Sequence, residues 1–462
     1  MFTSWLKPHL FFLLLALPTG LLLIFLTPPF QSPDEVNHFF KAWQISEGHW
    51  VGQKQDDRVG GKIPRSVIQV TKPFLAARYD PHSHISSETI CDAAKISDSS
   101  DSAEFMDFPN TAVYSPICYL PQATTICILR LFGLPPLVIF YCARLAGFLF
   151  WLMMVYFSIR KLTAFQWILT ALALLPMSLS TNSSLTADVM TNATAFYLLA
   201  FLLGAIMNGE KFVRKTWLMA GLLAFLIASV KPVYWPLLLL MFLIPSSSFV
   251  RPQRRWLIIG SVFIVAVVTV SVWSSYTHKI YTPYETYNPE FREGIDLMKN
   301  ADAYDQLNYM LSDWSYSCKV ALLSVTRNVQ QYSTSYIGRL GYFDALLPIW
   351  LVAIFYLLLI SIALAERGGG QLRLKSILVL LSVFVISFLA IIISQHLVWD
   401  AVGSERVMIL QGRYLIPIAP LLFISMTKLS RYREKYAIGL SILCSLLSIT
   451  SIFTVTYFRY YG

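Results

Sequence analysis

The feature that most constrains this chain is a series of apolar runs, each about long enough to cross a lipid bilayer. About eleven runs are visible, near residues 9–27, 136–158, 165–180, 187–207, 216–230, 234–246, 256–275, 346–365, 376–394, 414–427 and 436–456. A helix of roughly 20 apolar residues spans the hydrocarbon core and satisfies its own backbone hydrogen bonds there. Only 13% of the residues are charged, against about 25% in soluble domains. The sequence therefore predicts an all-α polytopic protein embedded in a lipid bilayer.

Positive charge is concentrated in short segments between alternate apolar runs. These segments hold Arg160-Lys161, Lys211 to Lys215, Arg251 to Arg255, Arg367 to Lys375 and Lys428 to Lys435, while Lys7 precedes the first run. Short loops rich in Lys and Arg stay in the cytoplasm. The net charge of +10 therefore reflects topology and argues against a nucleic-acid partner. We expect a cytoplasmic amino terminus, with residues 28–135 and the carboxyl terminus on the outer face.

One ambiguous run, residues 112–132, decides this topology. If it crossed the membrane, Lys7 and the later basic segments would fall on opposite faces. Its two prolines, its polar side chains and Arg130 favour a helix that lies in the membrane interface. That interpretation keeps every basic segment on one side, so we predict an interfacial helix here. The pair of runs around Lys231-Pro232 is expected to form two tilted or broken helices that meet at a turn.

Two adjacent carboxylates, Asp34 and Glu35, follow the first apolar run. Carboxylates beside a bilayer are costly to place and mark candidate functional sites. The stretch Ser32-Pro33-Asp34-Glu35 also has the pattern of a capping box, with Ser32 as the N-cap. The residues alone leave two interpretations open. The carboxylates could supply a base at the lipid–water boundary, or they could only start an amphipathic helix that lies on the membrane.

The predicted helix has one apolar face, made of Val36, Phe39, Phe40 and Trp43. Lys41 and Gln44 lie off that face, and Gly48 is placed to end the helix. His38 lies one turn beyond Asp34, where it could orient the carboxylate or bind phosphate. It could equally be a partly exposed interfacial histidine.

Other candidate residues lie near the outer ends of predicted spans. Arg413 and its neighbour Tyr414 begin the tenth run, and we predict that Arg413 contacts a phosphate. Lys231 lies at an outer turn and Arg144 lies inside the second span, where cationic side chains often only reach toward water. Asp188 starts the fourth span and could either line a pocket or complement the helix dipole.

The acidic pair directly after span one resembles the hallmark of the GT-C glycosyltransferases. The chain is still more similar to a bacterial branch of multi-spanning proteins long catalogued as a domain of unknown function. The segments that carry this similarity run in order over nearly the whole chain, namely Pro33-Asp34-Glu35-Val36-Asn37-His38-Phe39, Tyr114-Ser115-Pro116-Ile117-Cys118-Tyr119-Leu120-Pro121-Gln122, Gly338-Arg339-Leu340-Gly341-Tyr342-Phe343-Asp344 and Gln411-Gly412-Arg413-Tyr414-Leu415-Ile416-Pro417. The first and last of these segments are the most specific.

The resemblance implies a GT-C-like bundle of about eleven spans with interfacial helices in the first outer loop. It implies sugar transfer from a polyprenyl-phosphate donor to a glycan acceptor, such as O-antigen of lipopolysaccharide, on the periplasmic face of a bacterial inner membrane. Asp34 would be the general base, and Glu35 would be its neighbour or a contact to metal or substrate. A divalent metal remains open, and no nucleotide is expected because no nucleotide-binding motif is present.

Three parts of the chain are expected to differ in role. Residues 1–275 would form the catalytic module, 276–345 a second outer loop and 346–462 the carboxyl-terminal spans. Two other functions compete with sugar transfer. A lipid-linked sugar flippase would favour charges deep in several spans and related halves, and a membrane glycan polymerase or ligase usually has its large outer loop late in the chain.

Overall fold

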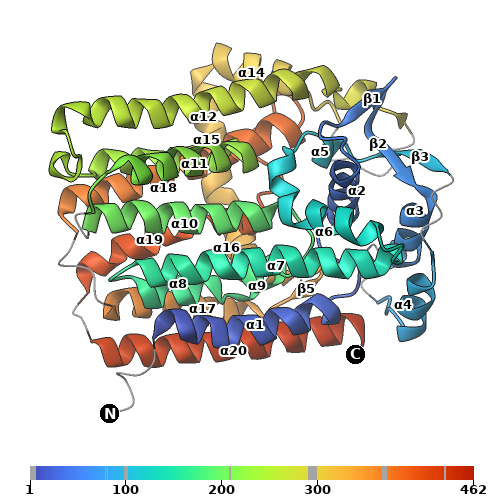
Figure 1. The fold of residues 1–462 in the computed structure, drawn as a ribbon, viewed down its shortest axis with the longest axis horizontal. Helices are drawn as coiled ribbons and strands as arrows, with labels where there is room; N and C mark the ends of the chain where they lie inside the picture. Colours follow the sequence, from blue (N-terminus) through green and yellow to red (C-terminus); the bar gives the residue numbers. More distant parts are fainter. Residues whose placement is uncertain are drawn as a thin grey trace.

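The computed structural model describes residues 7–78, 80, 82–97, 102–207, 210–289, 299–366, 372–430 and 433–462. Its architecture is a bundle of long helices with a smaller cap at one end (Figure 1). About 73% of the chain is helical, which confirms the mostly α prediction. We use the word cap for residues 35–130, which contain the helices and strands between the first and second long helices.

Six described helices are long and apolar enough to cross a membrane. They are α1 (Pro8–Leu26), α7 (Pro136–Lys161), α10 (Asp188–Met207), α12 (Arg255–Thr277), α18 (Leu374–Trp399) and α20 (Glu434–Tyr460). Between them lie α11 (Arg214–Val230), η5 (Pro232–Leu243), α17 (Ile349–Ala365) and α19 (Ala419–Met426). The eleven predicted spans therefore correspond to six long helices and a set of shorter elements. The total of about eleven spans stays a prediction.

Proline explains why one predicted span is broken and why the chain turns between two others. The run near 165–180 forms α8 (Gln166–Ala173) and α9 (Pro176–Asn182), which part at Pro176. A proline ring cannot continue the hydrogen bonding of the preceding helix, so it begins a new one. The chain also turns at Lys231-Pro232, where Lys231 has an extended backbone between α11 and η5. This confirms the turn predicted between the fifth and sixth runs.

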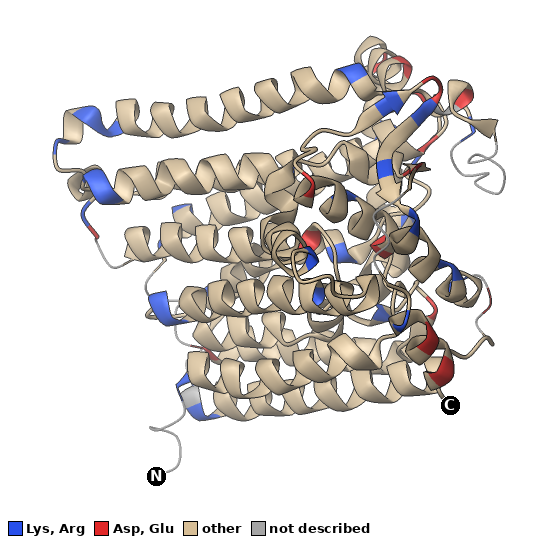
Figure 2. Cartoon of the chain, turned by 45° about the vertical axis from the view of Figure 1, so that its right-hand side comes forward, with Lys and Arg blue, Asp and Glu red and all other residues tan. Residues whose placement is uncertain are grey.

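The short basic segments between the long helices lie at the end of the bundle opposite the cap, while other basic residues lie in the cap itself (Figure 2). α7 ends in Arg160 and Lys161, and α12 starts directly after Arg254. The bundle therefore places the described basic segments on one side, as the sequence predicts. Arg367 and Arg431 lie outside the described residues. The compartment that each side faces stays a prediction.

The cap is built on a small antiparallel sheet that the sequence analysis did not foresee. Its strands are β1 (Gln53–Gln55), β2 (Arg58–Pro64) and β3 (Ala103–Asp107), in the order β1-β2-β3. The register pairs Gln53 with Gly60 and Gly60 with Asp107. The remaining elements of the cap are α2 (Glu35–Ser46), α3 (Arg65–Thr71), η2 (Lys72–Phe74), η3 (Ala76–Arg78), α4 (Ser87–Ala94), α5 (Pro109–Ala112), η4 (Pro116–Tyr119) and α6 (Leu120–Arg130).

Helix α2 differs from the predicted surface helix in two respects. Its start is not a capping box, because Asp34 is the N-cap residue, no side chain caps it and the Glu35 carboxylate turns away to Arg144. The helix is also buried on all sides: Lys41 and Gln44 are fully enclosed along with the apolar face. A helix enclosed in this way does not lie on a membrane surface.

The end of α2 and its enclosed lysine follow from local packing. The helix stops at Ser46, and Gly48 then takes the left-handed conformation with φ 86°, which confirms the predicted stop. Lys41 donates hydrogen bonds to Gln44 and to the carbonyl of Trp50. Burial lowers the pKa of the Lys41 ammonium to about 7, because an enclosed charge loses its hydration.

The ambiguous run 112–132 forms α6 after the short elements α5 and η4. α6 has 11 residues and packs along the part of α7 nearest the cap (Figure 1). It is not among the helices long enough to span a membrane. Its placement in the interface stays a prediction.

The segment between α12 and α17 returns toward the bundle through short elements. They are η8 (His278–Ile280), η9 (Tyr284–Thr286), α14 (Ala303–Ser312), α15 (Trp314–Arg327), α16 (Val329–Gly338), β4 (Arg339–Leu340) and β5 (Ala345–Leu346). The short helices η6 (Ser246–Ser248) and η7 (Pro252–Arg254) precede α12, while η11 (Gly412–Leu415) and η12 (Thr427–Leu429) flank α19. η11 packs against α16, and this contact brings Arg413 to the end of the bundle that faces the cap.

Candidate functional site

Asp34 lies at the boundary between the bundle and the cap. Its backbone takes the left-handed conformation, with φ 61°, and its side chain is 34% exposed. One carboxylate oxygen accepts a hydrogen bond of 3.1 Å from Asn110, whose amide is oriented by Asn37. The other oxygen lies 3.3 Å from a guanidinium nitrogen of Arg413. The carboxylate is thus held by two partners and remains accessible.

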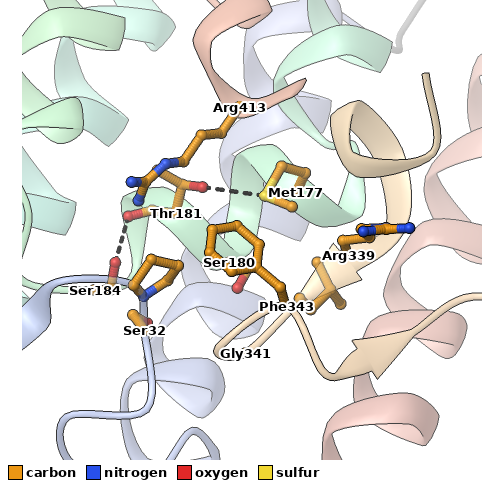
Figure 3. Close-up of a pocket in the computed structure, with 11 residues that line it drawn as sticks. Ser32, Met177, Ser180, Thr181, Ser184, Arg339, Gly341, Phe343 and Arg413 are labelled. Atoms are coloured by element: carbon orange, nitrogen blue, oxygen red, sulfur yellow. Dashed lines mark hydrogen bonds between the residues drawn. The ribbon is translucent and has the colours of Figure 1, made fainter. Parts of the chain in front are cut away.

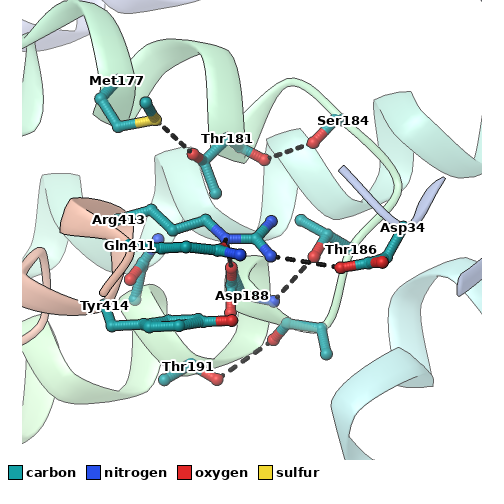
Figure 4. A network of polar contacts seen from close by, with 12 residues as sticks. Asp34, Met177, Thr181, Ser184, Thr186, Asp188, Thr191, Gln411, Arg413 and Tyr414 are labelled. Carbon is teal, nitrogen blue, oxygen red and sulfur yellow. Dashed lines mark hydrogen bonds and ion pairs between the residues drawn. The ribbon is translucent and has the colours of Figure 1, made fainter. Parts of the chain in front are cut away.

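A chain of alternating charges runs inward from Asp34. The Arg413 guanidinium lies between two carboxylates, with its Nε 3.6 Å from Asp188 (Figure 4). Asp188 in turn accepts a hydrogen bond from the ammonium of Lys231. Asp188, Arg413 and Lys231 are largely or fully enclosed, so these charges compensate one another in an environment where an unpaired charge would be costly.

Aromatic rings enclose the inner end of this chain. The Lys231 ammonium lies 4.7 Å from the centre of the Tyr414 ring and 5.8 Å from that of Tyr114, within the range of a cation–π contact. Tyr234 fixes the backbone of η11 by donating to the carbonyl of Tyr414 at 2.8 Å. The rings therefore hold the cations in place and exclude water from their inner side.

Glu35 forms a separate, closed ion pair with Arg144. The two side chains are 0% exposed, and the carboxylate accepts bonds of 2.8 and 2.6 Å from the guanidinium. Glu35 also accepts from the backbone N–H of Leu185 at 2.8 Å. The other guanidinium donors go to backbone carbonyls at the end of α1 and just after it, those of Ile24, Thr27 and Pro28.

This pair joins α1, α2, α7 and the segment before α10. All the N–H donors of Arg144 are used, so none is left for a phosphate. The geometry therefore favours a structural role for Glu35 and Arg144. Only Asp34, of the two adjacent carboxylates, faces accessible space.

His38 is also enclosed, and its imidazole ring makes no hydrogen bond with the Asp34 carboxylate; its backbone N–H donates to the Asp34 carbonyl at 2.9 Å. Its ring nitrogens lie 2.6 Å from the Tyr119 hydroxyl and 3.2 Å from the Thr186 hydroxyl. Burial lowers the pKa of His38 to about 4, although the negative charges of Asp34 and Asp188 oppose this shift. A neutral ring that exchanges hydrogen bonds with two hydroxyls supports the loop before α10. This position differs from that of an exposed interfacial histidine.

A small cavity of about 10 Å³, with room for about one water molecule, lies beside Arg413. It is bounded by Ser32 and Pro33, by one face of α9 and by the turn after β4 (Figure 3). Helix α9 contributes Met177, Ser180 and Thr181, and Ser184 follows it. Strand β4 contributes Arg339 and Leu340, and the turn after it contributes Gly341 and Phe343. No Asp or Glu lines the cavity within the described part of the chain.

The structure thus brings together five of the predicted residues and separates Glu35, His38 and Arg144 from them. Asp34, Asp188, Lys231 and Arg413 form one chain, with Tyr414 stacked against the cations. Residues 276–345 and 346–462 contribute to this site, so it extends beyond the predicted catalytic module 1–275.

Sequence reasoning missed Asn110 and Arg339. Asn110 lies just before the Tyr114 motif, and Arg339 lies inside the quoted Gly338 to Asp344 segment. Because both residues lie in or beside motifs quoted above, those motifs could have pointed to them.

Gly412 allows close packing between η11 and α16. A Cβ atom at this position would lie 2.1 Å from the backbone nitrogen of Tyr336 and 2.3 Å from the carbonyl oxygen of Tyr332. Glycine therefore lets η11 approach α16. Its N–H donates to the Ser335 hydroxyl at 2.7 Å, which fixes the segment that carries Arg413.

The donor set does not fit a divalent metal. Among the described residues no three His, Cys, Asp or Glu side chains converge on one point. Asp34 and Asp188, the two carboxylates nearest each other in the site, are bridged by the cationic Arg413. A guanidinium in that position repels a metal ion, so the chemistry below uses no metal.

A family model described as a predicted membrane protein, DUF2142, matches residues 17–422. The chain belongs to this family. The match confirms the predicted membership in a multi-spanning family catalogued as a domain of unknown function. It extends from α1 to α19, so the DUF2142 region contains every residue of the charge chain, while α20 lies beyond it. No curated protein and no solved structure matches the chain.

Proposed function

We propose that this protein is an inverting GT-C-type glycosyltransferase that moves a sugar from a polyprenyl-phosphate carrier to a glycan acceptor. The observation that carries the proposal is the position of Asp34. It is a partly exposed carboxylate held against the buried guanidinium of Arg413, where the cap meets the apolar bundle. An acceptor hydroxyl can reach it from the cap side, and a lipid-borne group can reach it from the bundle side.

The transfer needs one base and one site for the leaving phosphate. Asp34 takes the proton of the acceptor hydroxyl as its oxygen attacks the anomeric carbon. The bond from that carbon to the phosphate oxygen breaks on the opposite face, and the phosphate leaves with the electron pair. Arg413 lies beside this position and can stabilise the charge that develops on the phosphate. Attack on the opposite face inverts the anomeric configuration.

The neighbouring charged and polar residues hold Asp34 and Arg413 in position before the reaction. Asp188 and Lys231 fix the Arg413 guanidinium from behind, and Asn110 fixes the Asp34 carboxylate from the cap side. Such preorganised polar groups need little rearrangement during the reaction. In the absence of substrate, Arg413 also pairs with Asp34, and a bound phosphate would compete for this guanidinium.

The cap would face the periplasm of a bacterial inner membrane, and the acceptor would be a surface glycan such as O-antigen. The basic segments at the opposite end of the bundle support this orientation, because such loops stay in the cytoplasm. The structural analysis of the surface polysaccharide from a deletion strain would identify the sugar that is lost.

The chemistry is tested with the purified protein, a polyprenyl-phosphate sugar and the acceptor in liposomes. Asp34→Asn removes the base and should reduce transfer by about a hundredfold or more. The hydrogen bond from Asn110 and the fold should persist, because Asn retains an acceptor oxygen. Asp92→Asn, at an exposed carboxylate of α4, is the matched control and should keep full activity.

Two results would count against the proposal. Wild-type rates from a folded Asp34→Asn protein would remove Asp34 from the chemistry. If the wild-type protein instead moved the lipid between leaflets without forming a glycosidic bond, the flippase function would replace the transferase.

A further inference from the structure

Helix α14 has an apolar face that the rest of the described chain leaves uncovered. Tyr304, Leu307 and Leu311 follow one another at i, i+3 and i+7, so they share this face, and all three are exposed. Gln306 and Met310 lie on another face and are buried against the protein. A helix in water would place its leucines inside and its glutamine outside. The exposed leucines therefore indicate an apolar environment around this face.

A second exposed face of α14 is polar. Asp305, Asn308 and Ser312 have the same i, i+3, i+7 spacing, begin one residue later, and are exposed. One residue corresponds to about 100° of rotation, because an α-helix has about 3.6 residues per turn. The polar face therefore lies beside the apolar face, and both are separate from the buried one. A helix with adjacent apolar and polar exposed faces suits the boundary between lipid and water.

The end of α12 marks where this boundary lies. α12 begins directly after Arg254 at the basic end of the bundle and has 23 residues. At about 1.5 Å per residue it is about 35 Å long, enough to cross a hydrocarbon core of about 30 Å. Its carboxyl end therefore reaches the opposite boundary, and there Trp273 donates a hydrogen bond of 2.8 Å to the carbonyl of Val113 in the cap. Tyr276 is exposed near this end, at a depth where tyrosine is enriched in membrane proteins.

α14 starts at the level where α12 ends. The Tyr304 hydroxyl hydrogen-bonds to His278, the residue directly after α12. The backbone N–H of Ala303 donates to the Tyr281 hydroxyl at 2.8 Å. Few residues of α12 are buried, so lipid contacts most of this helix through exposed apolar side chains such as Ile264, Val267, Val268 and Val272. The apolar face of α14 therefore continues the lipid-facing surface of α12.

We infer that α14 lies in the lipid–water boundary at the cap end of the bundle, with its Leu307 and Leu311 face in the lipid and its Asp305 face in water. In Figure 1, α14 lies at the upper edge of the molecule. Trp314, the first residue of α15, is 72% exposed, and tryptophan is enriched at this depth. α14 contains Asp305 and neither Lys nor Arg, so burial of apolar surface holds it there, and attraction to anionic headgroups does not. The partner is the bilayer surface itself, and the inference does not depend on sugar transfer.

The buried face of α14 joins this boundary to the candidate site. The Gln306 side chain accepts a hydrogen bond of 2.8 Å from the N–H of Gly403 and donates one of 2.8 Å to the Tyr316 hydroxyl. Tyr316 in turn donates to the carbonyl of Ser404 at 2.8 Å. These contacts hold the segment between α18 and η11, which leads to Arg413. The depth of α14 in the membrane therefore helps to set the position of Arg413.

Spin labels measure the depth of α14 in the full chain, reconstituted in bilayers of neutral phosphatidylcholine. Alanine replaces the native cysteines that are not buried, and single labels are then attached to Leu307→Cys, Asn308→Cys, Leu311→Cys and Ser312→Cys. Labels at the two leucine positions should collide mainly with oxygen, which concentrates in lipid. Labels at the two polar positions should collide mainly with a water-soluble nickel chelate. The leucine face should lie about 5–10 Å deep in the boundary between headgroups and acyl chains.

Reference labels and a pair of charge substitutions calibrate the result. Val267→Cys on α12 gives the value for lipid, and Asp92→Cys on α4 gives the value for water. Leu307→Asp places a carboxylate on the lipid face and should shift the Leu311→Cys label toward the nickel chelate. Asn308→Asp adds the same charge one residue away on the water face, and as the matched control it should leave that label unchanged.

The same pattern of labels should persist in high salt and when anionic lipid is added, because charge does not hold the helix in place. Loss of the pattern in high salt would overturn the inference. Equal access of the nickel chelate to all four labels would place α14 in water. Labels at Leu307→Cys and Leu311→Cys that neither reagent reaches would show that another protein surface covers this face. Each of the last two results also overturns the inference.

Discussion

Glu35→Gln should unfold the protein far more than it affects chemistry. The substitution removes the negative charge that lies 2.6 Å from a guanidinium nitrogen of Arg144, in a pair that is 0% exposed. It also weakens the bond to the N–H of Leu185. Breaking a buried ion pair from one side typically costs about 3–5 kcal/mol, because the remaining charge is left without compensation. At roughly 2 °C per kcal/mol for a large chain, the melting temperature should fall by about 6–10 °C.

The assay is thermal unfolding in detergent, followed by tryptophan fluorescence and by the monodisperse fraction on size exclusion. Asp34→Asn, at the neighbouring position, should melt within about 2 °C of the wild type, because its carboxylate is partly exposed. The double substitution Glu35→Gln with Arg144→Met removes both charges, so it should cost less than the sum of the two single changes. A Glu35→Gln protein with wild-type stability and no transferase activity would refute the structural assignment and return Glu35 to the chemistry.

Three further predictions concern the rest of the site. Arg413→Lys keeps the charge but loses the planar fork, so transfer should fall about ten- to a hundredfold with the fold retained; equal rates would exclude a bidentate phosphate contact. Gly412→Ala should lower the melting temperature and the transfer rate together, because a Cβ there meets the Tyr336 backbone at 2.1 Å; normal stability would contradict this packing. The pKa of His38 is about 4 when folded and about 6.5 when unfolded, so the unfolded chain binds more protons between these values. Stability should therefore be full above pH 6.5 and fall by about 3 kcal/mol toward pH 4, and His38→Gln should remove most of this dependence in pH-dependent melting.

The sequence predicted those features that depend on local pattern. Apolar runs of span length predicted the helical membrane bundle, and the turn at Lys231-Pro232 follows from the properties of proline. The charge bias of the short loops predicted that the described basic segments share one end. The position of Asp188 at the start of α10 was also visible in the sequence, because a long apolar run begins there.

Only the tertiary structure decided how the two adjacent carboxylates differ. The sequence gives no reason to distinguish Asp34 from Glu35, because the two are adjacent and both belong to the same capping pattern. The left-handed backbone at Asp34 turns it toward Arg413, which is 379 residues away in the chain, while Glu35 points into the bundle and meets Arg144. Periodicity and composition report only on residues that are near one another in the sequence. Charge pairing between α2, α7, α10 and η11 depends on how the helices pack, and that packing made one carboxylate structural and left the other partly exposed.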